Sequence, residues 1–270
     1  YLLIEAINKK YPKQIYYVSS DIDDKVNDLD IKNIYIGKGV LMQLFFLIVN
    51  GENLFLTLTD LDNSIIKKNK NIKNYIYFFH SPVSTIKNYT PKAFDNYDTI
   101  LCNGEFQVKE IRLRESLKKL NQKKIINTGY FYFDYLKEKL NYKVLNNEIL
   151  IAPSWNYSQK NFLNEDFVEL INVLLKKGEK VIFRPHPEHL KRSEKILKKI
   201  KENNSNLNFY FDDNKENFSS MQKSKCLITD SSGIALEYMI ILKRPVLYLD
   251  ENDKIHNTDI KDYANINIID

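Results

Sequence analysis

Short apolar runs alternate with amphipathic helical segments along most of the chain. In the first half, this pattern predicts helices at 40–49 and 105–120, and strands at 14–19, 33–36, 53–59, 75–79, 99–102 and 124–127. In the second half, it predicts helices at 165–177, 190–201 and 234–242, and strands at 149–152, 180–183, 207–211, 226–229 and 246–249. Because parallel strands need a crossover connection that is usually a helix, the alternation indicates an α/β fold with parallel sheets covered on both faces.

The alternation restarts near residue 146, which divides the chain into two expected domains. We predict one Rossmann-like domain over residues 1–146 and a second over residues 147–270. The strands expected in the second domain are typical of a nucleotide-binding unit. Two such domains facing each other form a cleft, so we expect the ligand site in that cleft.

The composition supports folded domains and excludes several classes of protein. The hydrophobic content is 43%, which rules out a disordered chain. The net charge is +5, and a mildly basic surface favours anionic partners such as nucleotides, polyphosphates or acidic lipid headgroups. The basic residues are scattered and no aromatic-and-basic RNA motif occurs, so no nucleic-acid partner is expected.

Metal-binding and membrane-spanning patterns are not evident. Cys102 and Cys226 do not form a His and Cys cluster with ligand spacing, so we expect neither a metal nor a cofactor. There is no secretory signal and no run of about 18 apolar residues, so no transmembrane helix is predicted. The longest apolar run, 40–49, is expected to form a buried helix. The chain opens at Tyr1 without a methionine, and we expect it to be a segment of a longer protein.

The segment 226–249 predicts a strand, a tight turn, a short helix and a second strand. The turn consists of Asp230, Ser231, Ser232 and Gly233, which are residues that start helices or allow close backbone approach. The first amides of a helix lack intrahelical partners and lie at the positive end of its dipole, so this turn suits a phosphate oxygen. A turn of this composition can also serve only as a helix cap.

A second motif follows the strand 180–183. Arg184 and His186 alternate with two prolines, and Glu188 and His189 are expected in the first turn of the next helix. In an open α/β sheet, ligands bind in the crevice at the carboxyl ends of the strands. We expect the strand before Arg184 and the strand before Asp230 to be adjacent, so that both motifs reach one crevice.

Six short segments give the chain a resemblance to a known family. The sequence resembles the CDP-glycerol glycerophosphotransferases that build teichoic-acid-like polymers, a family with a two-domain GT-B architecture. The segments that carry the resemblance are Phe79-His80-Ser81-Pro82, Phe94-Asp95-Asn96-Tyr97-Asp98, Thr128-Gly129-Tyr130, Ile149–Asn156, Arg184-Pro185-His186-Pro187 and Thr229-Asp230-Ser231-Ser232.

The resemblance implies an enzyme that moves a phosphopolyol of the glycerol-phosphate type. The donor would be CDP-linked, and the acceptor would be a hydroxyl of a surface polymer or capsule. The N-terminal domain would bind the acceptor and the C-terminal domain the nucleotide donor. Roles follow for the matching residues: His80 as general base, His186 with Arg184 on the donor phosphates, Ser231 and Ser232 on the same diphosphate, Asp230 and Gly233 in the turn that presents them, and Glu237 on the ribose.

The resemblance also implies partners and a location, and it leaves alternatives open. The partners would be the nucleotide-activated donor and a polymer or lipid-linked acceptor. The location would be cytoplasmic, with peripheral contact to the inner face of the plasma membrane left open. The alternatives are a GT-B glycosyltransferase that uses a nucleotide sugar, a nucleotide-sugar 2-epimerase of the same fold, and a non-catalytic nucleotide-binding module.

Overall fold

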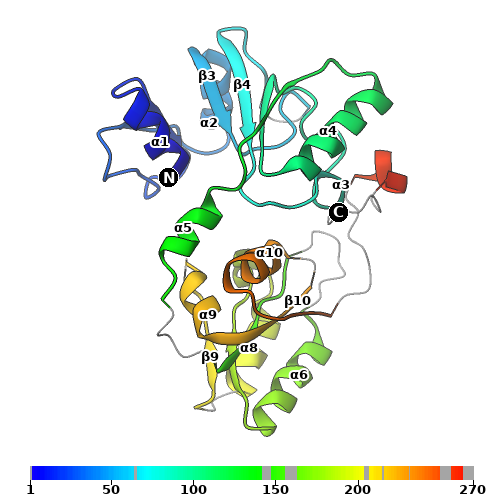
Figure 1. Cartoon of the computed structure of the whole chain (residues 1–270). Coiled ribbons are helices and arrows are strands. Elements are labelled where there is room, and N and C mark those ends of the chain that lie inside the picture. The colour runs from blue at the N-terminus through cyan, green and yellow to red at the C-terminus, as the bar shows by residue number, and fades with distance from the viewer. Residues whose placement is uncertain are drawn as a thin grey trace. The chain divides into compact units, whose positions relative to one another are not determined.

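The computed structural model describes residues 2–63, 66–141, 147–155, 163–203, 207–214, 216–230, 232–249 and 257–263 (Figure 1). Contacts divide the chain into two compact units. Unit 1 comprises Tyr1–Tyr132 and Ile255–Asp270, and unit 2 comprises Phe133–Lys254. This division lies after Tyr132, whereas the sequence placed the boundary at residue 146, and it groups the C-terminal residues with the first unit. The C-terminal segment contacts unit 1 directly, since the Asn257 N–H donates to the Ile86 carbonyl at 3.0 Å.

Unit 1 contains a four-stranded parallel sheet whose strands are neighbours in chain order. These strands are β3 (Gly51–Leu56), β4 (Ile72–Phe78), β5 (Thr99–Cys102) and β6 (Lys124–Asn127). The first two strands, β1 (Tyr16–Ser19) and β2 (Lys32–Tyr35), pair with each other in a separate parallel sheet.

Aromatic side chains dominate the core of unit 1. Tyr75, Tyr77 and Phe79 alternate along and just beyond β4, so they point to the same face of the sheet and pack with Phe94 and Tyr97. The helices of this unit are α1 (Leu2–Lys10), α2 (Val40–Ile48), α3 (Thr85–Asn88) and α4 (Glu105–Lys118).

Helix α2 is exposed, and the expectation of a buried helix at 40–49 was wrong. Phe46 is its one buried residue. Val40 is 69% exposed and Ile48 is 73% exposed. Apolar content alone did not predict burial, because unit 1 covers only one side of this helix. Among the helices that the structure describes, none combines the length and apolarity that crossing a bilayer requires.

Unit 2 contains a five-stranded parallel sheet in the order β11-β10-β7-β8-β9. The chain runs outward from β7 through β8 to β9, then returns to place β10 on the other side of β7. This reversal is the topological switch point at which open α/β sheets bind their ligands. The strands are β7 (Glu148–Ile151), β8 (Lys180–Phe183), β9 (Phe209–Phe211), β10 (Ser224–Thr229) and β11 (Val246–Tyr248).

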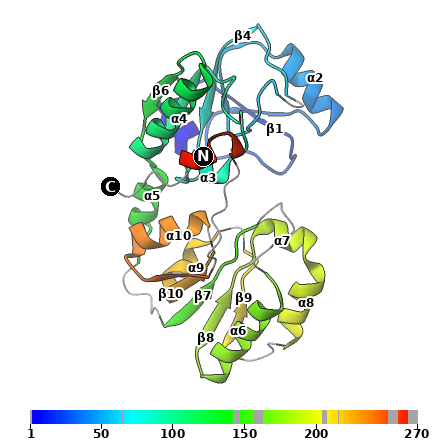
Figure 2. The ribbon, with the colours of Figure 1, turned by 90° about the vertical axis from the view of Figure 1, so that its right-hand side faces the viewer.

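Helices cover both faces of this sheet (Figure 2). Ile149 and Ile151 pack with α6 (Glu165–Lys176) and α8 (Glu194–Asn203) on one face. Leu150 and Ala152 pack on the other face with α9 (Phe218–Lys223) and α10 (Gly233–Glu237). The remaining helices are α5 (Tyr132–Glu138), α7 (Pro187–Arg192) and a π-helical turn, Tyr238–Leu242. The α/β class with parallel sheets is therefore confirmed.

Candidate functional site

The loop after β7 separates the two motifs that were expected to be adjacent. Strand β7 lies between β8 and β10, so the expectation that the strands before Arg184 and Asp230 are neighbours was wrong. The strands remain parallel, and their carboxyl ends therefore meet at the same edge of the sheet. Both motifs thus lie at one edge, with residues 152–155 between them.

Asp230 binds the loop after β7 to the turn before α10. Its side chain is fully buried, and its carboxylate accepts hydrogen bonds from the Ser154 N–H at 2.7 Å and the Ser154 hydroxyl at 2.6 Å. Because a buried carboxylate is costly without such donors, the pair fixes the two loops at the switch point. Asp230 is thus a structural anchor of the site.

The turn that follows Asp230 leads into α10. Ser232 is the residue before the helix, and its N–H donates to the Asp230 carbonyl at 2.7 Å. Among the described residues, its hydroxyl makes no capping hydrogen bond. Gly233 is the first helical residue. Ser231, predicted to bind the diphosphate, lies outside the described residues.

Arg184 is held in an ion pair. Its Nη1 lies 2.6 Å from Asp212 Oδ2, and its Nη2 donates to the Asn214 carbonyl at 2.8 Å. The two side chains are 13% and 1% exposed. The guanidinium therefore secures the loop after β9, and its predicted contact with the donor phosphates remains a prediction.

His186 caps α7 and presents its ring at the edge of the sheet. Its Nδ1 accepts a hydrogen bond from the Glu188 N–H at 3.2 Å. Since Nδ1 is an acceptor, the neutral ring carries its proton on Nε2 and can donate from there. The side chain is exposed, yet the protein around it partly desolvates the ring and, together with nearby His189, lowers the pKa of His186. The neutral form is therefore favoured at neutral pH.

His189 joins α7 to the loop after β7, which the sequence did not indicate. It lies in the first turns of α7, as predicted, and it is fully buried. Its Nε2 is 3.0 Å from the Ser154 carbonyl, and its Nδ1 is 2.9 Å from the Ser193 hydroxyl. Because a carbonyl only accepts, Nε2 carries the proton. The Trp155 ring packs edge-on against the imidazole at 5.0 Å.

Glu237 lies at the end of α10. It is 9% exposed, and its Oε2 accepts from the Asn217 side-chain amide at 3.3 Å. This hydrogen bond connects α10 to the start of α9. The ribose role expected for Glu237 remains a prediction.

His80 follows β4 in unit 1 and lies beside the loop after β6. Its side chain is exposed, while the surrounding protein still desolvates the ring and lowers its pKa from the ordinary value of 6.5. The Tyr130 hydroxyl donates to the His80 carbonyl at 2.9 Å. The Thr128 hydroxyl donates to the Cys102 carbonyl at 3.0 Å. Two segments that carry the family resemblance, 79–82 and 128–130, therefore meet at the carboxyl edge of this sheet.

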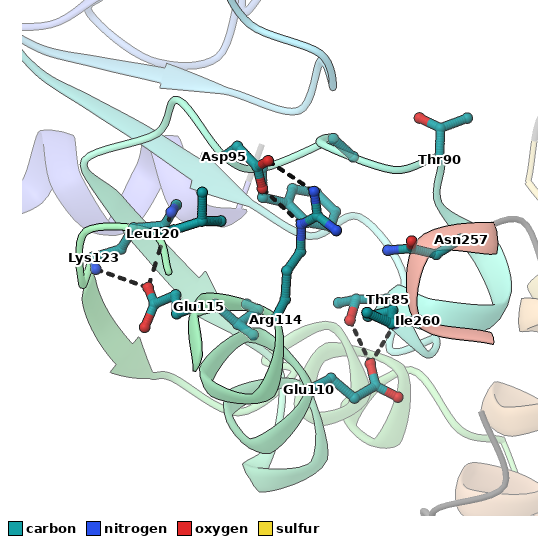
Figure 3. A pocket seen from close by; sticks show the side chains of 13 residues that line it. Thr85, Thr90, Asp95, Glu110, Arg114, Glu115, Leu120, Lys123, Asn257 and Ile260 are labelled. Atoms are coloured by element: carbon teal, nitrogen blue, oxygen red, sulfur yellow. Dashed lines mark hydrogen bonds and ion pairs between the residues drawn. The ribbon is translucent and has the colours of Figure 1, made fainter. Parts of the chain in front are cut away.

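A small cavity in unit 1 is too small to be the ligand site (Figure 3). Its volume is about 10 Å³, roughly one water molecule. Arg114 in its wall forms two hydrogen bonds with Asp95, at 2.7 and 2.8 Å. Ligand pockets measure several hundred Å³, so this cavity belongs to the packing of unit 1.

No grouping of metal-ligating side chains occurs within the described ranges. Asp-x-Asp triplets do occur in the sequence, at 21–23, 28–30 and 60–62. In the part of the chain that the structure describes, none of them joins a cluster of three or more His, Cys, Asp or Glu side chains suited to a metal ion.

Comparisons with known proteins identify the family and the fold. A family model described as CDP-glycerol:poly(glycerophosphate) glycerophosphotransferase matches residues 66–267. No curated protein matches the chain in sequence. Among solved structures, the wall teichoic acid polymerase TagF superposes with a TM-score of 0.57 and 18% identity, over 92% of this chain and 64% of that one. The chain therefore spans slightly less than two thirds of TagF.

Two epimerase structures share the fold. UDP-GlcNAc 2-epimerase from Methanocaldococcus jannaschii superposes with a TM-score of 0.54 and 18% identity, over 83% of this chain and 69% of that one. A putative UDP-N-acetylglucosamine 2-epimerase from Listeria monocytogenes gives 0.54 and 13%, over 84% and 66%. These likenesses confirm the GT-B type of fold. At identities this low they carry no information on activity, because one fold can serve many functions.

Proposed function

The chain belongs to the CDP-glycerol:poly(glycerophosphate) glycerophosphotransferase family, and on that premise we propose that it transfers a glycerol-phosphate-type group from a CDP-linked donor to an acceptor hydroxyl. The acceptor would be a polymer or lipid-linked molecule. The observation that carries the proposal is the family match over residues 66–267, which includes His80, His186 and the turn at 230–233. The teichoic acid polymerization named for TagF is chemistry of the same kind.

The donor diphosphate would bind at the switch point of unit 2. His186 offers an Nε2–H donor there, because the cap on α7 occupies its Nδ1. The turn at 230–233 would add the Ser232 hydroxyl and the N–H groups that begin α10. As a neutral donor, His186 would direct a phosphate oxygen by hydrogen bonding. Arg184 would contribute by holding the strand end beside His186.

His80 would take the proton from the acceptor. The acceptor oxygen would form a bond to the β-phosphorus while the bond from that phosphorus to the CMP oxygen breaks, so CMP leaves. Such transition states are loose, and the protein contributes mainly positioning and charge stabilisation. The lowered pKa of His80 keeps the ring unprotonated at neutral pH, which a base requires.

Peripheral contact with the membrane inner face stays a prediction. The exposed apolar residues of α2 and the net charge of +5 would both favour an anionic lipid surface. These features support the proposal that the acceptor is reached at a membrane.

Two histidine variants test the proposed roles separately. His80→Ala should lower kcat for CMP release from CDP-glycerol by about 10²- to 10⁴-fold and leave donor binding intact. His186→Ala should weaken CDP-glycerol binding, measured by calorimetry. Leu190→Ala is the control. Leu190 is exposed on α7, the helix that His186 caps, and its replacement should change neither kcat nor the affinity for CDP-glycerol.

Unchanged turnover in both histidine variants would refute the site. Product analysis addresses the donor. CMP together with a phosphodiester product supports the proposal, whereas a nucleoside diphosphate with a glycoside would indicate a sugar-transferring enzyme instead.

A further inference from the structure

The loop that carries His80 is held at its beginning by the segment after β6. Gly129 has a φ of +68°, a left-handed conformation that glycine adopts without strain. This turn directs Tyr130 back toward β4, where its hydroxyl donates to the His80 carbonyl at 2.9 Å. The main chain of His80 is therefore fixed by a side chain from two strands away.

Helix α4 holds the other end of the same loop. Glu110 is 7% exposed, and its carboxylate accepts from the Ser84 hydroxyl at 2.6 Å, the Thr85 N–H at 2.5 Å and the Thr85 hydroxyl at 2.6 Å. One turn earlier, fully buried Gln107 donates to the Val83 carbonyl at 2.9 Å. Both side chains lie on the same face of α4, because residues three apart are neighbours on a helix.

The Glu110 carboxylate fixes the positions of two adjacent residues, because it accepts three hydrogen bonds from Ser84 and Thr85. Charge-assisted hydrogen bonds fix geometry more narrowly than apolar contacts do. Ser84 also caps α3, since its hydroxyl accepts from the Ile86 and Lys87 N–H groups. Glu110 thus sets where α3 begins, and with it the path of the chain from His80 to Ser84.

We propose that Glu110 and Tyr130 are positioning residues that hold the His80 loop in its productive geometry for proton transfer. The inference rests on the proposed function, in which His80 is the base. Neither residue needs to touch substrate. Their effect would come through placement, and a misplacement of about 1 Å can cost roughly a hundredfold in rate.

The same helix supplies a matched control. Glu115 is 5% exposed, and it accepts from the Lys123 N–H at 2.8 Å and from Arg112 at 2.5 Å. Figure 3 shows the hydrogen bonds of Glu110 with Thr85 and the interactions of Glu115 with Lys123. Both glutamates are buried and saturated with donors, but only Glu110 reaches the loop of His80. Glu115→Gln therefore measures how much stability and activity are lost when α4 loses a buried carboxylate that does not contact the His80 loop.

The experiment compares Glu110→Gln, Tyr130→Phe and Glu115→Gln in the full chain. CMP release from CDP-glycerol is measured with a glycerol-phosphate-terminated lipid as acceptor. Glu110→Gln and Tyr130→Phe should lower kcat about ten- to a hundredfold, with the KM for CDP-glycerol unchanged. Glu115→Gln should lower the melting temperature and keep the wild-type kcat. Glu110→Asp, which retains the charge, should recover part of the lost kcat.

A second measurement does not depend on turnover. With ¹⁵N-labelled histidine, Glu110→Gln and Tyr130→Phe should shift the ring resonances of His80 and leave those of His186 in place. Wild-type kcat and unshifted His80 resonances in both variants would overturn the positioning role, even if His80→Ala abolishes turnover. Full turnover in His80→Ala would instead show that His80 is not the base, which removes the premise of the positioning role, and the resonance shifts would then report only a structural link between the loop and its partners. Tyr130→Phe keeps the test decisive if Glu110→Gln fails to fold.

Discussion

The buried carboxylate of Asp212 gathers donors from three segments of unit 2. Arg184 reaches it from the end of β8, Ser220 from α9 at 2.5 Å, and Asn214 from the loop after β9. Burial by itself would raise the pKa of Asp212, but the hydrogen bonds from Ser220, Arg184 and Asn214 outweigh it, and the pKa lies below its ordinary value of 3.8. Because the pKa of Asp212 is lower in the folded chain than in the unfolded one, its carboxylate stabilises the folded chain at pH values above the ordinary pKa. This stabilisation is lost as the pH falls through the pKa of the folded chain.

Arg184→Ala should therefore destabilise the protein by about 3 kcal/mol at neutral pH, because it leaves a buried carboxylate without its cation. The difference from wild type should shrink in acid, below the ordinary carboxyl pKa of 3.8, because protonation of Asp212 removes the charge that Arg184 pairs with. Urea unfolding at the two pH values measures both effects. Arg192→Ala is the control, since Arg192 is 61% exposed in its pair with Glu188 and should cost under about 1 kcal/mol. Equal destabilisation by the two variants would contradict this account.

Single residues of the site could be located from the sequence, but their partners could not. Arg184 and His186 follow a short apolar run, which predicts the end of a buried strand. The carboxylate that binds Arg184 lies 28 residues further on, in a loop with no distinguishing pattern. The Ser154–Asp230 pair is 76 residues apart in the chain. Such pairs depend on strand order, and alternation of strands and helices does not specify that order.

At the scale of elements, the sequence pattern predicts one continuous helix over residues 234–242, but the backbone hydrogen bonding changes type partway along this segment. Five residues are α-helical, and Tyr238–Leu242 then form a π-helical turn. The side chain of Tyr238 is fully buried, and its hydroxyl donates to the Ser224 carbonyl at 3.0 Å and accepts from the Ser224 hydroxyl at 3.1 Å. This contact ties the turn to the beginning of β10.

Tyr238→Phe should cost about 1–2 kcal/mol, because it removes a buried hydroxyl and leaves the Ser224 carbonyl without that donor. Thermal unfolding followed by circular dichroism measures the loss. Tyr248→Phe, at a position 47% exposed, should change stability by less than about 0.5 kcal/mol. A Tyr238→Phe protein as stable as wild type would show that the hydroxyl does not anchor the turn.

Most elements could be predicted from the sequence, because their signals are local. β5, β6 and β8 have the expected bounds, and α4 and α6 end within two residues of the expected positions. The separate β1–β2 sheet could not be predicted, since pairing partners are set by tertiary packing. The exposure of α2 could not be predicted for the same reason.

At the scale of the whole molecule, a segment from the far end of the chain completes unit 1. Ile260 is 3% exposed and packs with Ile86 and Leu113. Asp259 lies 3.6 Å from Arg114 and 3.7 Å from Lys118. These contacts cover α3, the helix that directly follows the His80 loop.

Ile260→Ala should destabilise unit 1 by about 2–4 kcal/mol through loss of buried side-chain volume. Hydrogen exchange should show faster exchange in α3 and α4, with β7 and β8 unchanged. Leu247→Ala, at a position 54% exposed in unit 2, should leave both regions at wild-type rates. Uniform acceleration across both units after Ile260→Ala would contradict an effect confined to unit 1.

The position of residues 257–263 in the chain also determines the order in which the two units can be completed during translation. A ribosome releases residues from the amino terminus onward, and domains generally fold as they emerge. Unit 2 is contiguous, so it can reach its final form while translation continues. Synthesis of unit 1 begins before that of unit 2, yet residues 257–263, which pack on unit 1, emerge only after residues 133–254. Of the two units, the one that begins first is therefore completed second.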